Sequence, residues 1–123
     1  MTSREQALAE VNAGDIVFGV GTGGQPKLLL VYRVHEDGLS ARHITTQANY
    51  RFDRNGKTRV YADGGQVTIV STARLDAERF KVAIGLDRKA AGRPEYPDTI
   101  LTPAEIELMV THRSFFEAHL LPA

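Results

Sequence analysis

The stretch from Gly14 to Val34 constrains the fold most, because it contains the strongest strand signal of the chain. Residues 28–34 read Leu-Leu-Leu-Val-Tyr-Arg-Val, and apolar, β-branched and aromatic side chains of this kind favour a strand. The first four of these residues, 28–31, are all apolar, so apolar side chains lie on both faces of the expected strand. We therefore predict that this strand lies in the centre of a sheet and is buried on both sides.

A glycine loop precedes this strand. Gly19, Gly21 and Gly24 match the G-x-G-x-x-G pattern, whose backbone amides hold a pyrophosphate at the start of a helix. That interpretation needs a helix directly after the last glycine, whereas this chain continues into the strand signal. We therefore assign the glycines to the turn of a hairpin and expect no nucleotide cofactor. Valine at Gly21 or Gly23 is expected to perturb the hairpin by forbidding a positive φ.

Length and composition limit the class of protein. The 123 residues fit a single domain, 1–123, and the hydrophobic fraction of 42% is ordinary for a folded chain. Fifteen basic residues balance fifteen acidic ones, so the net charge gives no general attraction to DNA or to an anionic membrane. The absence of cysteine excludes a disulfide framework and fits the cytoplasm. We also expect neither a secretory signal nor a membrane anchor.

Turn residues divide residues 15–71 into about six short strands. The best turn is Asn55-Gly56, the favoured pair for a two-residue type I′ hairpin. Compact turns between successive strands indicate an antiparallel meander. The hairpin register pairs Phe52 with Arg59, Asp53 with Thr58, and Tyr50 with Tyr61.

Helices are expected at the two ends of the chain. Ser3 and Gln6 form a capping-box pattern at the start of a short helix within residues 1–13. Thr102, Pro103 and Glu105 combine an N-cap, a proline at the first helical position and a glutamate at the third, which predicts a helix over 102–120.

A further helix is predicted over residues 75–91, followed by a loop over 92–101 that contains two prolines. The alternative for residues 80–86 is a strand, because Phe80, Val82, Ile84 and Leu86 also alternate with a period of two.

Histidines are the first candidates for chemistry. His43 lies on a predicted strand face with Leu39 and Ala41, where a partly buried, hydrogen-bonded imidazole is the simplest interpretation. An enzymatic alternative uses His43 as a base with Arg42 or a nearby hydroxyl. His112 and His119 are seven residues apart, whereas compact metal pairs on helices use a spacing of four, so no metal is expected.

The distribution of charge indicates a binding surface. Residues 27–59 contain seven basic side chains and three acidic ones, and the segment from residue 94 to the end is acidic. Around Asn55-Gly56, arginines alternate with aromatic residues, a combination that single-stranded RNA recognition uses. A solvated sheet face opposite a core face is the simpler interpretation. The predicted binding residues are Arg42, Tyr50, Arg51, Arg54, Lys57 and Arg59.

The sequence Gly14-Asp15-Ile16-Val17, followed by Pro26 and an apolar strand, resembles the opening of the toxin ribonucleases of the PemK and MazF type. This resemblance covers about twenty residues. It implies a small SH3-like barrel that cuts RNA. The family's opening usually carries an arginine just before the proline, where this chain has Gln25, so we transfer no catalytic residue.

Together these patterns predict an α+β domain, with a curved antiparallel β-meander or small SH3-like barrel over residues 15–71 and two later helices packed on it. The leading functional hypothesis is a non-enzymatic binding module that uses the basic and aromatic sheet surface, with a protein, its own copy or RNA as partner. The alternative is a small hydrolase or ribonuclease that uses His43 and Arg42. No cofactor, metal or membrane is expected in either case.

Overall fold

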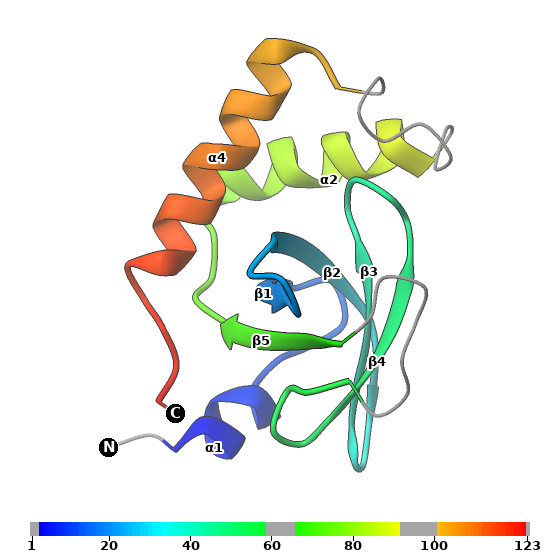
Figure 1. Ribbon diagram of the computed structural model, residues 1–123, viewed down its shortest axis with the longest axis vertical. Coiled ribbons are helices and arrows are strands. Elements are labelled where there is room, and N and C mark those ends of the chain that lie inside the picture. The colour runs from blue at the N-terminus through cyan, green and yellow to red at the C-terminus, as the bar shows by residue number, and fades with distance from the viewer. Residues whose placement is uncertain (1–2, 59–65, 92–100, 123) are drawn as a thin grey trace.

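The computed structural model describes residues 3–58, 66–91 and 101–122. Five strands form one antiparallel sheet in the order β4-β3-β2-β1-β5, and two long helices follow it in the chain, so the fold is α+β (Figure 1). In chain order, the elements are α1 (Arg4–Ala9), β1 (Ile16–Gly21), β2 (Pro26–His35), β3 (Gly38–His43), β4 (Asn49–Asp53), β5 (Val67–Ser71), α2 (Ala77–Ala91) and α4 (Pro103–Glu117).

The sheet is built around β2, as the sequence predicts. Leu29 and Val31 are fully buried on one face of this strand, and Leu28 is 2% exposed on the other. β1 and β3 pair with its two edges. A strand with apolar side chains on both faces needs a covering layer on each side, and the rest of the fold supplies these two layers.

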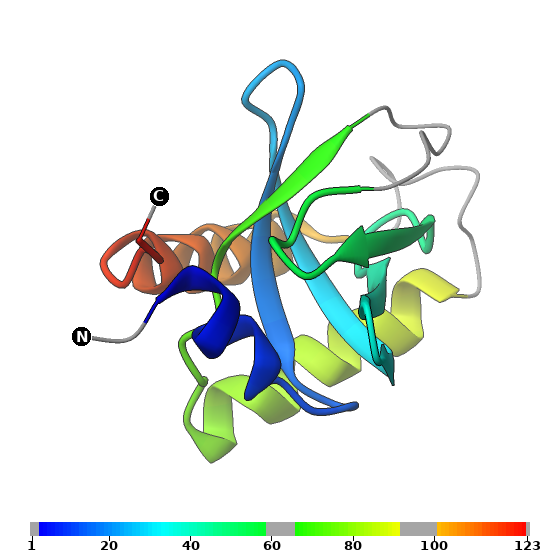
Figure 2. The same ribbon diagram turned by 90° about the horizontal axis from the view of Figure 1, so that it is seen from below.

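One core lies inside the curl of the sheet and the other lies under the helices. Leu8 and Val11, from the N-terminal segment, join the inner core. Ala83 and Leu86 of α2 and Phe116 of α4 pack on the opposite face of the sheet. Figures 1 and 2 show the same arrangement, with α1 on one side of the sheet and α2 and α4 on the other.

Backbone irregularities curl the sheet into a half-barrel. The pairing of β1 with β5 shifts between Phe18 and Gly19, and the pairing of β2 with β3 shifts between Val31 and Arg33. Such bulges bend a strand and increase its twist. Residues 57 and 58 then link the two edges of the sheet, because Thr58 bridges to Phe52 of β4 and Lys57 bridges to Thr68 of β5.

The predicted register at Asn55-Gly56 is wrong by one residue. Phe52 pairs with Thr58 rather than with Arg59, and the amide of Asp53 donates to the carbonyl of Lys57. The carboxylate oxygen Oδ1 of Asp53 accepts hydrogen bonds from the amides of Asn55 (2.8 Å) and Lys57 (3.1 Å). This side chain stabilises a three-residue loop, in which Gly56 has the positive φ of +74°. Tyr61 and Arg59 lie outside the described residues.

In the glycine loop, the left-handed residue is Gly24 (φ +83°), not Gly21 or Gly23. The loop joins two strands, as expected, and its amides therefore do not begin a helix. Residues 80–86 belong to α2, so the helix prediction is confirmed and the strand alternative is wrong. Both predicted capping boxes form, at Ser3 with Gln6 and at Thr102 with Glu105.

Gly38 is expected to be the most sensitive glycine of the hairpins. Its φ is +152°, and a Cβ atom there would lie 1.9 Å from the carbonyl oxygen of Phe52. Gly38→Ala should therefore lower the free energy of unfolding by roughly 3 kcal/mol, because β4 must move away. Gly24→Ala is the control, since its added methyl meets no atom within 4 Å and costs about 1 kcal/mol of backbone strain. Urea unfolding of both variants tests this, and equal losses would contradict the steric argument.

Candidate functional site

His43 is at the end of β3 and is 8% exposed. Its Nδ1 atom shares a hydrogen bond of 2.9 Å with the hydroxyl of Thr46, which fixes the ring. Among the described residues, Nε2 of His43 has no hydrogen-bond partner. This atom is not fully buried. Burial, and secondarily the charge of Lys27, lower the pKa of His43 to about 4. The imidazole is therefore neutral at pH 7.

His43 lines a small cavity between β1, β2, the end of β3 and α4, which we call the His43 cavity. Its volume is about 150 Å³. Lys27 of β2 and Arg113 of α4 are among the residues that line it, and no carboxylate is among the described ones. Because His43 pairs with Leu29, the side chains of His43 and Lys27 share one face of the sheet, and Arg113 comes from the helix on the other face. Arg113 has one weak ion pair, to Glu117 at 3.7 Å. The lining residues are Phe18, Pro26, Lys27, Leu28, His43, Thr45, Ile106, Met109, Val110 and Arg113.

Arg42, which the enzymatic alternative pairs with His43, is engaged elsewhere. Its Nη2 atom lies 2.9 Å from Oδ2 of Asp87 in α2, whose side chain is only 4% exposed. The amide Nε2 of Gln47 donates to the other oxygen of Asp87 at 2.7 Å, and Gln47 has a positive φ of +64°. Successive side chains of a strand point to opposite faces. Arg42 therefore joins β3 to α2, and the structure does not bring it to the His43 cavity.

The arginines of the predicted sheet surface also have partners. Arg51 forms an exposed ion pair with Asp37 at 3.0 Å. Arg54 donates from Nε to the carbonyl of Glu36 at 3.2 Å. Lys57 is exposed in the segment that links β4 to β5, and Arg59 lies outside the described residues.

Tyr50 does not contribute an aromatic plane to this surface. Its side chain is 3% exposed and packs in the inner core with Phe52, because both residues point to the concave face of β4. The alternation of arginines and aromatics along β4 thus separates the two kinds of side chain onto opposite faces. Among the described residues, the one aromatic side chain that is largely exposed is Tyr32, beside Arg33 at the bulge of β2.

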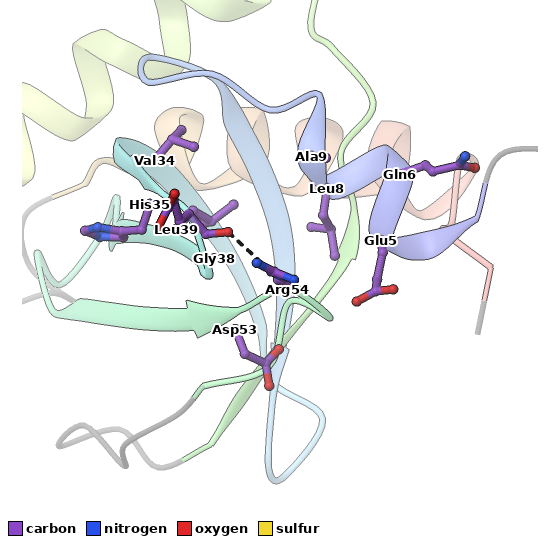
Figure 3. A pocket seen from close by; sticks show the side chains of 11 residues that line it. Glu5, Gln6, Leu8, Ala9, Val34, His35, Gly38, Leu39, Asp53 and Arg54 are labelled. Carbon is purple, nitrogen blue, oxygen red and sulfur yellow. Dashed lines mark hydrogen bonds between the residues drawn. The ribbon is translucent and has the colours of Figure 1, made fainter.

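A second cavity, of about 360 Å³, lies between α1 and the turn that joins β2 to β3. Figure 3 shows Leu8 and Glu5 of α1 facing the turn, with the hydrogen bond from Arg54 beside them. Glu5, Glu36 and Asp53 line this cavity together with Arg54 and His35. Its mixed charges give it no clear preference for a cation or an anion.

Sequence reasoning found His43 but missed its two cationic neighbours. Lys27 was only one of several basic residues in a long segment, and Arg113 follows it 86 positions later on another element. No local motif joins the two. The useful signal would have been that α4 must cover β1 and β2, which places one turn of the helix beside Lys27.

The two histidines of the C-terminal helical segment have different surroundings. His112 is 2% exposed against the helical layer, whereas Nδ1 of His119 bonds to the carbonyl of Phe115. Within the described residues, there is no group of three side chains suited to hold a metal ion. None of the described helices is long and apolar enough to span a membrane.

Comparison with known proteins identifies no relative. Neither the family models, nor the curated proteins, nor the solved structures contain a match to this chain. The likeness of Gly14–Val17 and Pro26 to toxin ribonucleases therefore depends on those residues alone. The fold defines the protein as an α+β half-barrel with two covering helices.

The depressed pKa of His43 predicts an acid-sensitive fold. In the unfolded chain, His43 takes up a proton near pH 6.5, whereas in the folded chain it does so near pH 4. The unfolded state therefore binds more protons between these values, so stability falls as the pH drops from 6.5 to 4, by about 3 kcal/mol from this group. Urea unfolding from pH 7 to 4.5 should show a shallower loss in His43→Gln. Identical slopes in the two proteins would contradict the assignment.

Proposed function

We propose that the protein is a non-enzymatic binding module that takes an anionic group, a phosphate or a carboxylate, into the His43 cavity. The observation that supports this is that Lys27 and His43 share one face of the sheet, close enough for the charge of Lys27 to lower the pKa of His43, at a cavity with no carboxylate in its described lining. The backbone of Lys27 pairs with Gly19, but its side chain forms no hydrogen bond or ion pair with any described residue. A cation without a partner, in a site with apolar walls, attracts an anion more strongly than an exposed ion pair does.

The state of His43 favours binding over catalysis. A general base is most effective when its pKa lies near the working pH, and a pKa of about 4 is well below that. A neutral imidazole can still donate one hydrogen bond to an anion from Nε2 when Nδ1 accepts from the hydroxyl of Thr46. We therefore assign His43 the role of a neutral donor beside the cation of Lys27.

Phenyl phosphate is a suitable probe, because it combines an anionic group with an apolar ring that fits the cavity walls. Titration should shift the imidazole resonances of His43 saturably and raise the pKa of His43, since a bound anion favours the protonated ring. Lys27→Glu should weaken this binding at least tenfold, because it replaces an attractive charge with a repulsive one.

Lys81→Glu is the matched control, since it makes the same charge change on the exposed surface of α2. The proposal predicts that this variant binds phenyl phosphate as the wild type does. An unchanged His43 resonance throughout the titration would refute the proposal, as would equal loss of binding in the two variants.

The alternative function is a small hydrolase or ribonuclease that uses His43. The observation in its favour is that His43 lines a cavity with two cations, although Arg42 is bound to Asp87. Single-stranded RNA incubated with purified protein tests it. Cleavage that disappears in His43→Gln and persists in Lys81→Glu would establish this alternative, whereas intact RNA with saturable phosphate binding would favour the binding module.

A further inference from the structure

A row of polar side chains crosses three strands on the outer face of the sheet. Arg33 of β2 pairs with Ser40 of β3, and Ser40 pairs with Arg51 of β4, so the three side chains share one face. This is the outer face, because the residues on either side of Ser40 belong to the inner core. Residues 31–43 are all described, and none of them belongs to the apolar cluster under α2 and α4. The surface, which we call the hairpin face, consists of Tyr32, Arg33, His35, Ser40 and Arg51.

The cations of the hairpin face are not neutralised by carboxylates. Arg33 is exposed, and its side chain forms no hydrogen bond or ion pair with any described residue. Arg51 pairs with Asp37 at 3.0 Å, but both side chains are more than 40% exposed, and an exposed pair of this kind is weak. Glu36 lines the cavity beside α1 instead. An incoming anion can therefore bind Arg33 directly and compete with Asp37 for Arg51.

A buried hydroxyl and an imidazole lie between the two arginines. Nε2 of His35 is 2.8 Å from Oγ of Ser40, whose exposure is 7%. Figure 3 shows the ring of His35 directed away from α1. Burial, and then the charges of Arg51 and Arg33, lower the pKa of His35, whereas the charge of Asp37 raises it. Both guanidinium groups are therefore close to the imidazole.

The bulge of β2 adds an aromatic plane to this face. Tyr32 is the extra residue of the bulge, so Tyr32 and Arg33 together oppose Ser40. Val31 points into the inner core, and alternation from it places Tyr32 on the outer face. The Tyr32 side chain is 46% exposed. Regular alternation along β4 separates arginines from aromatics, whereas the bulge leaves Tyr32 and Arg33 on the same face.

The spacing fits one phosphate group with an attached planar base. Neighbouring strands lie about 4.8 Å apart, so the Cα atoms of Arg33 and Arg51 are roughly 10 Å apart with Ser40 between them. Two long arginine side chains can meet at one phosphate across that distance. We propose that the hairpin face binds single-stranded nucleic acid, with a backbone phosphate between Arg33 and Arg51 and a base stacked on Tyr32. This surface is separate from the His43 cavity, and the inference does not depend on the anion site there.

The exposed ring favours nucleic acid over a phosphorylated peptide. Both ligands would present a phosphate to the same two cations. Only a nucleotide also brings a base, and stacking of bases on exposed aromatic side chains supplies much of the affinity for single strands. The net charge of the chain is zero, so the contacts that attract the strand have to be local ones.

Fluorescence anisotropy with a labelled oligouridylate of about eight nucleotides, a usual site size, tests the proposal at constant ionic strength. Arg33→Glu should lower the affinity at least tenfold, because it turns an attractive charge into a repulsive one. Tyr32→Ala should lower it roughly tenfold, whereas Tyr32→Phe, which keeps the ring, should stay within twofold of the wild type. Lys81→Glu makes the same charge change on α2 and should also stay within twofold.

Two further measurements locate the phosphate. Asp37→Asn should raise the affinity severalfold, because Arg51 no longer shares its charge with that carboxylate. Glu78→Gln removes an exposed carboxylate of α2 in the same way and should have no effect. In nuclear magnetic resonance titrations, bound oligouridylate should raise the pKa of His35, since the phosphate offsets the charges of the two arginines.

The outcomes separate this inference from the proposed function. Shifts at His35 with unchanged His43 resonances would support the hairpin face and count against the anion site alone. Binding that is lost in His43→Gln but kept in Arg33→Glu would place the strand at the His43 cavity and overturn the inference.

The same titrations distinguish other ligands of the hairpin face. An inert Tyr32→Ala, tighter binding of a phosphoserine peptide with alanine flanks, or a response of His35 to inorganic phosphate without oligouridylate binding would each refute recognition of nucleic acid. Equal losses in Arg33→Glu and Lys81→Glu would reduce the effect to general charge and refute a defined site. Circular dichroism confirms that each variant remains folded.

Discussion

Burial of β2 on both faces is the constraint on which the rest of the structure depends. A strand with Leu29 and Val31 on one face and Leu28 on the other needs a packing layer against each face, because a single layer buries only one of them. The curl of the sheet, closed at one side by α1, covers the first face. The helices α2 and α4 must then cover the second face.

Docking of α4 creates the His43 cavity as a consequence. Phe116 is fully buried and stacks on Phe18 of β1, so the axial position of the helix is fixed by an apolar contact. Arg113 precedes Phe116 by three residues and therefore lies about one turn further toward the start of α4. That turn faces Pro26 and Lys27 at the start of β2. Arg113 thus reaches the edge of the cavity because the apolar residues beside it pack.

Much of the fold could be predicted from sequence, because the signals are local. The capping boxes at Ser3 and Thr102 and the two-faced strand each specify their own element. The register of the hairpin at Asn55-Gly56 could not be predicted in this way. The carboxylate of Asp53 accepts hydrogen bonds from the loop amides, and the turn is one residue longer than expected. The site was harder still. Its residues come from β2, β3 and α4, and only the packing of the helical layer brings them together.

The neighbouring residues Arg42 and His43 show how one strand can hold a stabilising ion pair on one face and a candidate site residue on the other. Asp87 is nearly inaccessible to solvent, and a buried carboxylate without its cation is strongly destabilising. Arg42 is therefore committed to the contact between β3 and α2, and its Nε atom is buried there without a partner. Because the next side chain along a strand points the opposite way, His43 faces away from this ion pair. Lys27 lies two residues before Leu29, the partner of His43, so its ammonium shares the face of the imidazole while Arg42 stays with Asp87 on the other face.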